Sequence, residues 1–402
     1  MSDAALEVVL AARHVLTPEG MVGPGWLSLS GGRIDAIGSG PPPTDRPRID
    51  LRDQICAPGF VDLHVHGGAG AQVNADTAAD AREAVGRIAA FHLTHGTTGL
   101  LPTTVSDTPE RTLATVAGVV AAIEDEGAAR VLGVHLEGPW LAPGRAGAQD
   151  RTALRGIDEV EVDRLLEATQ GHLRIVTLAP ELPGAERLID RLVAAQAIVS
   201  IGHTEADYEV AKGAVERGAR HFTHLFNAMP PLSHRRPGPV GVALTESEVA
   251  AELIADGLHV HPAMLAIAFA QSERPILITD ASAAAGLPEG AMARLGRVEV
   301  IVADGAVTLA GDRRTLAGSA LTMDAAVRTM VEQAGVGLPE ALEAASTTPA
   351  AAIGRPDLGR LREGAAADLV VLDEDLVVAA TLVGGRALYD RDGTLTGSGS
   401  GT

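Results

Sequence analysis

Cysteine is almost absent from this chain. Cys56 is the only one among 402 residues, which excludes an intrachain disulfide and favours a reducing compartment, so we expect a cytoplasmic protein. Aromatic residues make up only 2% of the chain, so aliphatic side chains and alanine must fill the core. There is neither an apolar run long enough to span a bilayer nor a basic leader followed by an apolar stretch, and we therefore expect no membrane anchor.

Positive charge is also scarce. Asp and Glu total 52 against 32 for Lys and Arg, and the formal net charge of −20 argues against nucleic acid or an anionic membrane as a partner. Arginine is abundant, whereas lysine occurs only as Lys212. An anionic ligand would therefore need a local basic pocket to overcome the field of the whole chain.

What the chain does have is a regular alternation of apolar strands and helical patterns. The predicted strands are Gly59–Val65, Thr98–Pro102, Val131–Leu136, Leu173–Leu178, Ile198–Gly202, His221–Phe226, Ala250–Ala255 and Pro275–Thr279. This order predicts a (β/α)8 TIM-type barrel over residues 57–359, with an inserted hairpin at 297–309. Short β patterns at 1–56 and 360–402 predict one small β domain built from both termini.

The first predicted barrel strand ends in a pair of histidines. His64 and His66 are two residues apart, so in a strand their side chains point to the same face. Imidazole is the commonest metal ligand near neutral pH, so the pair is a candidate for binding one ion. For this motif alone, the alternative is that the two histidines belong to the core or the surface and bind no ion.

The rest of the chain favours the metal. Metal-capable side chains lie at the ends of six of the eight predicted strands, and because strand ends converge on one face of a barrel, we expect one shared site. These side chains are His64 with His66, Glu137, His203, His224, His259 and Asp280.

A shell of His, Glu and Asp without thiolate suits Zn²⁺ first, with Fe²⁺, Mn²⁺ and Co²⁺ as alternatives. Such an ion can lower the pKa of bound water to about 7, and Asp280 is our candidate for the residue that relays the proton. If two ions are bound, Glu137 is a better bridge than Lys212, which falls within a helical pattern. Arg235 and Arg236, in a Pro/Gly-bounded loop, form a candidate anion site, the alternative being solvated loop charges.

Several strings resemble those of a known family. Residues 58–67 resemble the opening metal motif of the amidohydrolase superfamily. The strings that begin at His135, His224 and Asp256, His-Leu-Glu-Gly-Pro, His-Leu-Phe-Asn-Ala-Met and Asp-Gly-Leu-His, are similar to those of the N-acetylglucosamine-6-phosphate deacetylases. The likeness covers nearly the whole chain. It implies a metal-dependent amide hydrolase with a small β-sandwich formed from both termini, usually a homodimer.

The resemblance also implies roles for individual residues. Glu137, His203 and His224 would bind the principal metal, and Asp280 would be the acid/base that takes a proton from water and returns it to the departing amine. The substrate would be held by His259 at the sugar, by Asn227, Ala228 and Arg235 at the phosphate, and by Ala148, Gln149, Leu316, Ala317 and Gly318.

Two features depart from common family patterns. Some members lack the His64–His66 pair and use one ion, so its presence here favours a second. Many members carry histidine where this chain has Gln149, which leaves the identity of the sugar phosphate open. The alternatives are N-acetylgalactosamine 6-phosphate, an N-acyl amino acid or a cyclic amide as substrate, or a sensor of sugar phosphates without catalysis. A sensor has no need of a positioned base such as Asp280.

Overall fold

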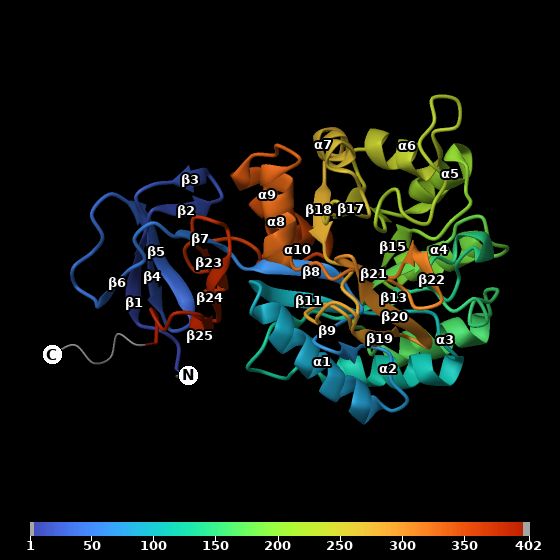
Figure 1. Ribbon diagram of the computed structural model, residues 1–402, viewed down its shortest axis with the longest axis horizontal. Coiled ribbons are helices and arrows are strands. Elements are labelled where there is room, and N and C mark those ends of the chain that lie inside the picture. The colour runs from blue at the N-terminus through green and yellow to red at the C-terminus, as the bar shows by residue number, and fades with distance from the viewer. Residues whose placement is uncertain (1–3, 397–402) are drawn as a thin grey trace.

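The computed structural model describes residues 4–396. A small all-β unit formed by both ends of the chain lies at one side of the molecule, and a larger unit of strands and helices lies at the other (Figure 1). No helix within residues 4–396 combines the length and apolar character needed to cross a membrane.

The larger unit is built around a parallel sheet of nine strands. Eight of them are β8 (Phe60–Val65), β11 (Thr97–Thr104), β13 (Val134–Glu137), β14 (Leu173–Leu178), β15 (Ile198–Ile201), β16 (His221–Phe222), β17 (Ala250–Ile254) and β18 (Pro275–Ile278). The ninth, β12 (Arg130–Val131), is a short addition beside β11. The backbone N–H of Asp280 donates to the His64 carbonyl at 2.9 Å, which brings the end of β18 back to β8 and closes the ring. The predicted barrel fold is confirmed.

Helices follow most of these strands and cover the outside of the ring (Figure 1). They are α1 (Ala78–Leu93), α2 (Pro109–Ala121), α3 (Glu159–Ala168), α4 (Ala185–Ala194), α5 (Tyr208–Arg217), α6 (Gly238–Thr245), α7 (Pro262–Gln271), α8 (Met323–Glu332), α9 (Leu338–Ala344) and α10 (Thr347–Ala352). Local chemistry sets their starts. Thr77 caps α1 by accepting from the Asp80 backbone N–H at 3.1 Å, and Thr108 caps α2, which opens with Pro109.

The small unit consists of two sheets packed face to face. One sheet has the order β5-β4-β1-β6, and the other β25-β24-β23-β7-β2-β3, so strands from both ends of the chain pair side by side. Their bounds are β1 (Val8–Ala12), β2 (His14–Thr17), β3 (Gly20–Val22), β4 (Gly25–Ser30), β5 (Arg33–Ser39), β6 (Arg48–Asp50), β7 (Ile55–Pro58), β23 (Leu369–Leu372), β24 (Val378–Val383) and β25 (Arg386–Asp390). Leu10, Leu27 and Leu369 belong to the separate apolar core that these sheets share, as a sandwich requires.

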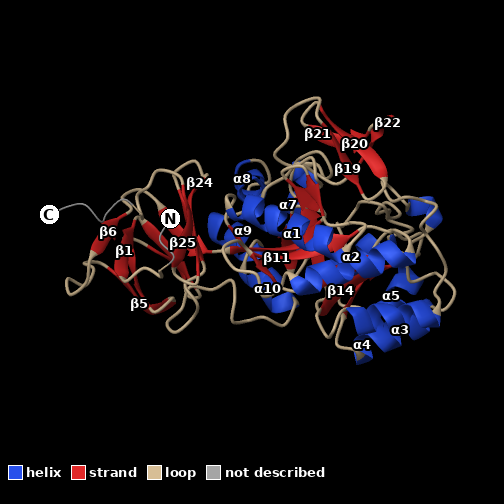
Figure 2. Ribbon diagram, turned by 90° about the horizontal axis from the view of Figure 1, so that it is seen from below, coloured by secondary structure: helices blue, strands red, loops and turns tan. Residues whose placement is uncertain are grey.

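The predicted hairpin at 297–309 is part of a larger insertion after β18. Its four antiparallel strands are β19 (Met292–Leu295), β20 (Val298–Ala303), β21 (Ala306–Leu309) and β22 (Asp312–Leu316). Figure 2 shows this sheet standing out from the barrel on a different side from the terminal sandwich. A two-stranded ribbon, β9 (Gly67–Gly68) and β10 (Ala71–Gln72), follows the first barrel strand.

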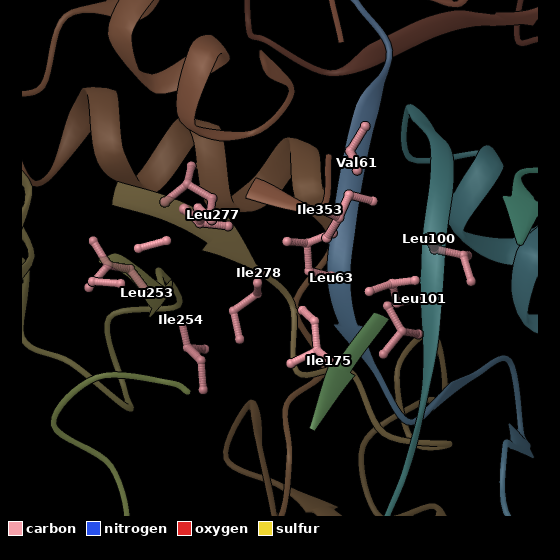
Figure 3. Close-up of a cluster of buried hydrophobic side chains, with 14 of the residues drawn as sticks. Val61, Leu63, Leu100, Leu101, Ile175, Leu253, Ile254, Leu277, Ile278 and Ile353 are labelled. Carbon is pink, nitrogen blue, oxygen red and sulfur yellow. The ribbon is translucent and has the colours of Figure 1, made fainter. Parts of the chain in front are cut away.

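Alternation along β8 shows how the barrel separates apolar packing from chemistry. Val61 and Leu63 belong to the apolar core and lie in one cluster with Ile353, just after α10 (Figure 3). Asp62 and His64 alternate with them, are equally buried, and make polar contacts across the barrel. The outer face of the strand therefore packs against helices, while its inner face carries polar groups toward the site.

Candidate functional site

The polar residues of the site lie at or just beyond the carboxyl ends of the barrel strands. Glu137 is the last residue of β13, and His66 follows β8 directly. His203, His224 and Asp280 lie two residues beyond β15, β16 and β18, with φ of 47°, 28° and 50°. Strand β16 ends at Phe222, so the sequence-based extension to Phe226 is wrong and His224 lies in a turn. Left-handed backbone at non-glycine residues costs about 1–3 kcal/mol each and is concentrated at functional sites.

Three side chains form a first group. Glu137 Oε1 lies 3.1 Å from His203 Nε2 and 3.1 Å from His224 Nε2, and the two ring nitrogens are 3.1 Å apart. All three residues are buried. Three strand ends thus present three potential ligand atoms at one point.

A second group lies next to the first. His64 Nε2 and His66 Nε2 are 3.0 Å apart, and Asp280 Oδ1 lies 3.2 Å from His66 Nε2 and 3.5 Å from His64 Nε2. Glu137 stands between the groups: its Oε1 faces the first group and also lies 3.6 Å from His64 Nε2, and its Oε2 lies 3.5 Å from His66 Nε2. Lys212 is remote from this arrangement, on α5, with Nζ 3.6 Å from Glu246.

The orientation of the rings fits metal binding. Three of the histidines place Nδ1 against an oxygen that can only accept, so Nδ1 carries a proton and, in the neutral ring, Nε2 keeps a lone pair. The acceptors are Glu252 for His64, the Thr103 carbonyl for His66 and the Arg145 carbonyl for His203, at 3.0, 3.0 and 2.7 Å.

If both rings are neutral, His64 and His66 turn two lone pairs toward each other at 3.0 Å, so this contact requires a positive charge, either a proton or a metal ion. A cation between them removes the conflict. Nitrogen ligands about 2.0–2.1 Å from a tetrahedral ion lie roughly 3.3 Å apart, close to the separation seen here. The side chains present therefore fit a divalent ion in each group.

Electrostatics of the site also favour positive charge. Burial opposes a charged His64, but Glu252, Asp280 and Glu137 raise its pKa to about 10. Burial likewise opposes the charged form of Asp280, yet His64 and His66 hold the pKa of this carboxyl below its usual value. The carboxylates create a field that stabilises a cation where the Nε2 atoms meet.

A cavity of about 240 Å³ opens over both groups. Several residues expected from the sequence to contact a substrate line its wall, namely Ala148, Gln149, Asn227, Ala228, His259, Leu316 and Gly318. Gln149 accepts from the Ser106 backbone N–H at 2.7 Å and donates to Glu137. His259 is held by Asp256, whose Oδ2 lies 2.6 Å from its Nδ1.

Two expected residues are not on this wall. Ala317 is fully buried and packs in the small core of the inserted sheet with Val300 and Val307. Arg235 lines a different cavity together with Tyr208 and Arg236.

Sequence reasoning also missed two charged residues. Arg314, on β22, is the sole arginine or lysine that lines the central cavity within residues 4–396. Glu252, in the middle of β17, is completely buried beneath the site. The sequence signal for Glu252 was a lone glutamate inside the apolar run from Val249 to Ile254. For Arg314 the signal was weaker, because it is only one of two adjacent arginines at the end of a hairpin.

A sequence model of the amidohydrolase family matches residues 55–388. The chain belongs to this family. Amidohydrolases generally depend on a divalent metal, and the two groups around Glu137 are candidate positions for one in this amidohydrolase.

Within this family, the chain is similar to curated relatives and solved structures of deacetylases that act on N-acetylhexosamine 6-phosphates. The amidohydrolase is 38% identical to N-acetylgalactosamine-6-phosphate deacetylase of Escherichia coli O157:H7, over 94% of this chain and 98% of that protein. It is 40% identical to human N-acetylglucosamine-6-phosphate deacetylase, over 86% of each chain. A mutant of N-acetyl-D-glucosamine-6-phosphate deacetylase from Mycobacterium smegmatis, solved with N-acetyl-D-glucosamine-6-phosphate, superposes with a TM-score of 0.89 at 39% identity, covering 95% of this chain and 99% of that one.

Proposed function

We propose that this amidohydrolase cleaves the acetamide of N-acetylglucosamine 6-phosphate, giving glucosamine 6-phosphate and acetate. The observation that carries the proposal is the convergence of two metal-capable groups and Asp280 on one cavity. The relatives named for this reaction, at 38–40% identity, support the choice of substrate.

Glu137, His203 and His224 are the proposed ligands of a principal ion, and His64, His66 and Asp280 those of a second. Glu137 would serve both, because its carboxylate lies 3.1 Å from His203 and His224 and 3.5–3.6 Å from His66 and His64. Zn²⁺ is our first choice for a shell of imidazoles and carboxylates, ahead of Fe²⁺, Mn²⁺ and Co²⁺. When bound, such an ion lowers the pKa of water and polarises a carbonyl oxygen.

Asp280 is the proposed acid/base. Its lowered pKa leaves it ionised at neutral pH, so it can accept a proton from the attacking water. It then gives that proton to the nitrogen of the departing amine as the C–N bond breaks, which returns the carboxylate to its starting state. Asp280 is buried beside the cavity, so its oxygens lie where the acetamide would bind.

The other wall residues would hold the sugar. His259 lines the cavity and is the proposed contact to a sugar hydroxyl, through Nε2, because Asp256 already engages its Nδ1. Ala148 with Gln149, and the loop of Leu316, Ala317 and Gly318, would border the ring. Ala317 would act through its backbone, because its side chain is buried away from the cavity.

The phosphate requires cations, and two arginines are proposed. Arg235, with Asn227 and Ala228, follows from the family resemblance, although Arg235 lines a separate cavity within one chain. Arg314 follows from its place on the wall of the central cavity. An arginine fork suits a phosphate group, and a chain with net charge −20 needs such a local counter-field. We also propose that the protein is a homodimer, which sedimentation analysis would test. We propose that it functions in the cytoplasm.

N-acetylgalactosamine 6-phosphate is the second candidate substrate, favoured by the 38% identity to the Escherichia coli deacetylase of that epimer. Acetate release should be measured with both N-acetylhexosamine 6-phosphates, their unphosphorylated forms and an N-acetyl amino acid. We expect the highest kcat/KM for N-acetylglucosamine 6-phosphate. Preference for the galactose epimer would correct the substrate, and binding of both phosphates without acetate release would instead identify a sensor.

A further inference from the structure

The histidines of the site are held from behind in different ways. His66 and His203 donate from Nδ1 to backbone carbonyls, of Thr103 and Arg145. His64 alone of these three donates from Nδ1 to a side chain, Glu252, at 3.0 Å. The orientation of His64 therefore depends on a residue that can be replaced without altering the backbone.

Glu252 lies in the middle of β17, on the barrel interior, with no exposed surface. Its Oε2 accepts from both His64 Nδ1–H and the His224 backbone N–H, the latter at 3.1 Å. Its Oε1 lies 3.2 Å from His221 Nε2. The same carboxylate oxygen thus touches one residue from each metal-capable group.

Burying a carboxylate in a barrel is costly unless positive or proton-donating groups surround it. Oε2 of Glu252 meets that requirement with two donors, and Oε1 lies beside the His221 ring but makes no hydrogen bond. A packing role alone would be met more cheaply by the aliphatic side chains found elsewhere in β17, such as Leu253 and Ile254. The cost of keeping a charge here points to a function at the site above it.

We infer that Glu252 is a positioning residue for the second ion: it fixes the His64 ring with Nε2 toward His66 and Asp280 and makes that nitrogen a stronger ligand. A carboxylate behind a ligating imidazole sets its tautomer and raises its basicity, and loss of such partners typically lowers metal affinity about 10–100-fold. This role rests on the two-ion form of the proposed function.

A third ion beneath the site is the competing explanation, because His64, His135 and Glu252 also lie close together. The ring nitrogens of His135 are already engaged, Nδ1 with the Leu63 carbonyl at 2.9 Å and Nε2 with Thr177 Oγ1 at 2.8 Å. His64 Nδ1 is committed to Glu252. These contacts make the lower group a hydrogen-bonded support rather than an ion site.

Glu252→Gln is the sharpest test, because the amide oxygen can keep both hydrogen bonds of Oε2 while the negative charge is lost. Metal-depleted wild type and variant would be titrated with Zn²⁺ in a calorimeter, and bound zinc would be counted by mass spectrometry after dialysis. We expect the second ion, proposed at His64, His66 and Asp280, to be the weaker one, and its Kd to rise about 10–100-fold in the variant. The principal ion should be retained.

Asp62→Asn is the matched control. Asp62 is another fully buried carboxylate of the barrel interior, but it touches His64 only at the backbone N–H, at 3.2 Å, and otherwise binds Thr279. A positioning role predicts wild-type affinity for both ions in Asp62→Asn. If the two variants weaken the second ion equally, the effect is general destabilisation and the inference is overturned.

Glu252→Asp provides a second variant should Glu252→Gln fail to fold. It keeps the charge but shortens the side chain by one methylene, which withdraws the acceptor from His64, so the weaker ion should again be lost first. Wild-type affinity for both ions in whichever variant folds, or equal loss of both ions, would refute the inference. A wild type that binds a single ion would refute the two-ion proposal itself, whereas failure confined to the variants leaves that proposal standing.

Discussion

Replacing Asp280 by asparagine removes a charge and a proton acceptor from the cavity while preserving the size of the side chain. Asp280 Oδ1 lies 3.2 Å from His66 Nε2, and an amide oxygen can occupy the same place. Because the proposed reaction uses this carboxylate for two proton transfers, and one such transfer contributes about 10²–10⁴-fold, we expect kcat to fall by at least roughly 10³, or about 4 kcal/mol. KM should change little, since the sugar contacts stay in place.

The assay must separate loss of the base from loss of an ion, because Asp280 also belongs to the second group. His66→Ala provides the comparison, as it removes a member of the same group and leaves the carboxylate. We expect bound zinc to fall in both variants but kcat to fall much further in Asp280→Asn. The zinc held by Glu137, His203 and His224 should remain in both.

Two results would refute this reasoning. If Asp280→Asn keeps kcat within about tenfold of wild type, Asp280 is not the acid/base. If His66→Ala loses as much kcat as Asp280→Asn at equal zinc content, the carboxylate acts only as a ligand. Acetate release at saturating N-acetylglucosamine 6-phosphate, with zinc measured on the same samples, distinguishes these outcomes.

Three further predictions follow from other parts of the structure. Glu137→Gln should release the tightly held ion together with activity, because Glu137 faces both groups, and metal analysis of the purified variant checks this. Arg314→Ala and Arg235→Ala should each lower kcat/KM for the phosphorylated sugar about ten- to a hundredfold and leave the unphosphorylated sugar nearly unchanged; equal loss on both sugars would make the arginine structural. Asp324→Asn should destabilise the fold by roughly 2 kcal/mol at neutral pH, because burial raises the pKa of Asp324 but hydrogen bonds, led by that from His95, lower it to about 2. A folded-state pKa below the unfolded value stabilises above about pH 4, so the difference between variant and wild type in urea unfolding should shrink from about pH 4 to pH 2.

Much of the site could be predicted because a parallel barrel converts positions along the chain into positions in space. Apolar runs located the strands, and polar residues at their carboxyl ends were therefore expected to meet. His64, Glu137 and Asp280 do meet in the structure, although their strands are far apart in sequence. A small β unit built from both termini was also predictable, because short β patterns occur at both ends of the chain, whereas its sandwich form was implied only by the family resemblance.

Other features depend on turns and insertions, for which the sequence carries a weaker signal. The apolar residues around His224 suggested a longer strand, but the chain leaves the β conformation after Phe222 and His224 adopts φ of 28°. Helix α6 is apolar on all sides, so it lacks the periodic pattern of an amphipathic helix such as α1. Arg314 reaches the cavity only because the inserted sheet folds over it, and strand pairing within an insertion does not specify that contact.

Glu252 shows most clearly why ligands are easier to predict than the residues that hold them. A ligand lies at a strand end, and the barrel fold alone states that strand ends share a site. A supporting residue lies one layer deeper, and its partner depends on the stagger between strands that are not neighbours, here β17 and β8. That stagger is set by packing of the whole ring. The sequence does show that Glu252 is out of place in an apolar strand, and a buried charge requires a partner. Only the folded barrel shows that this partner is Nδ1 of His64. Through that contact, a residue that does not line the cavity affects a proposed metal ligand within it.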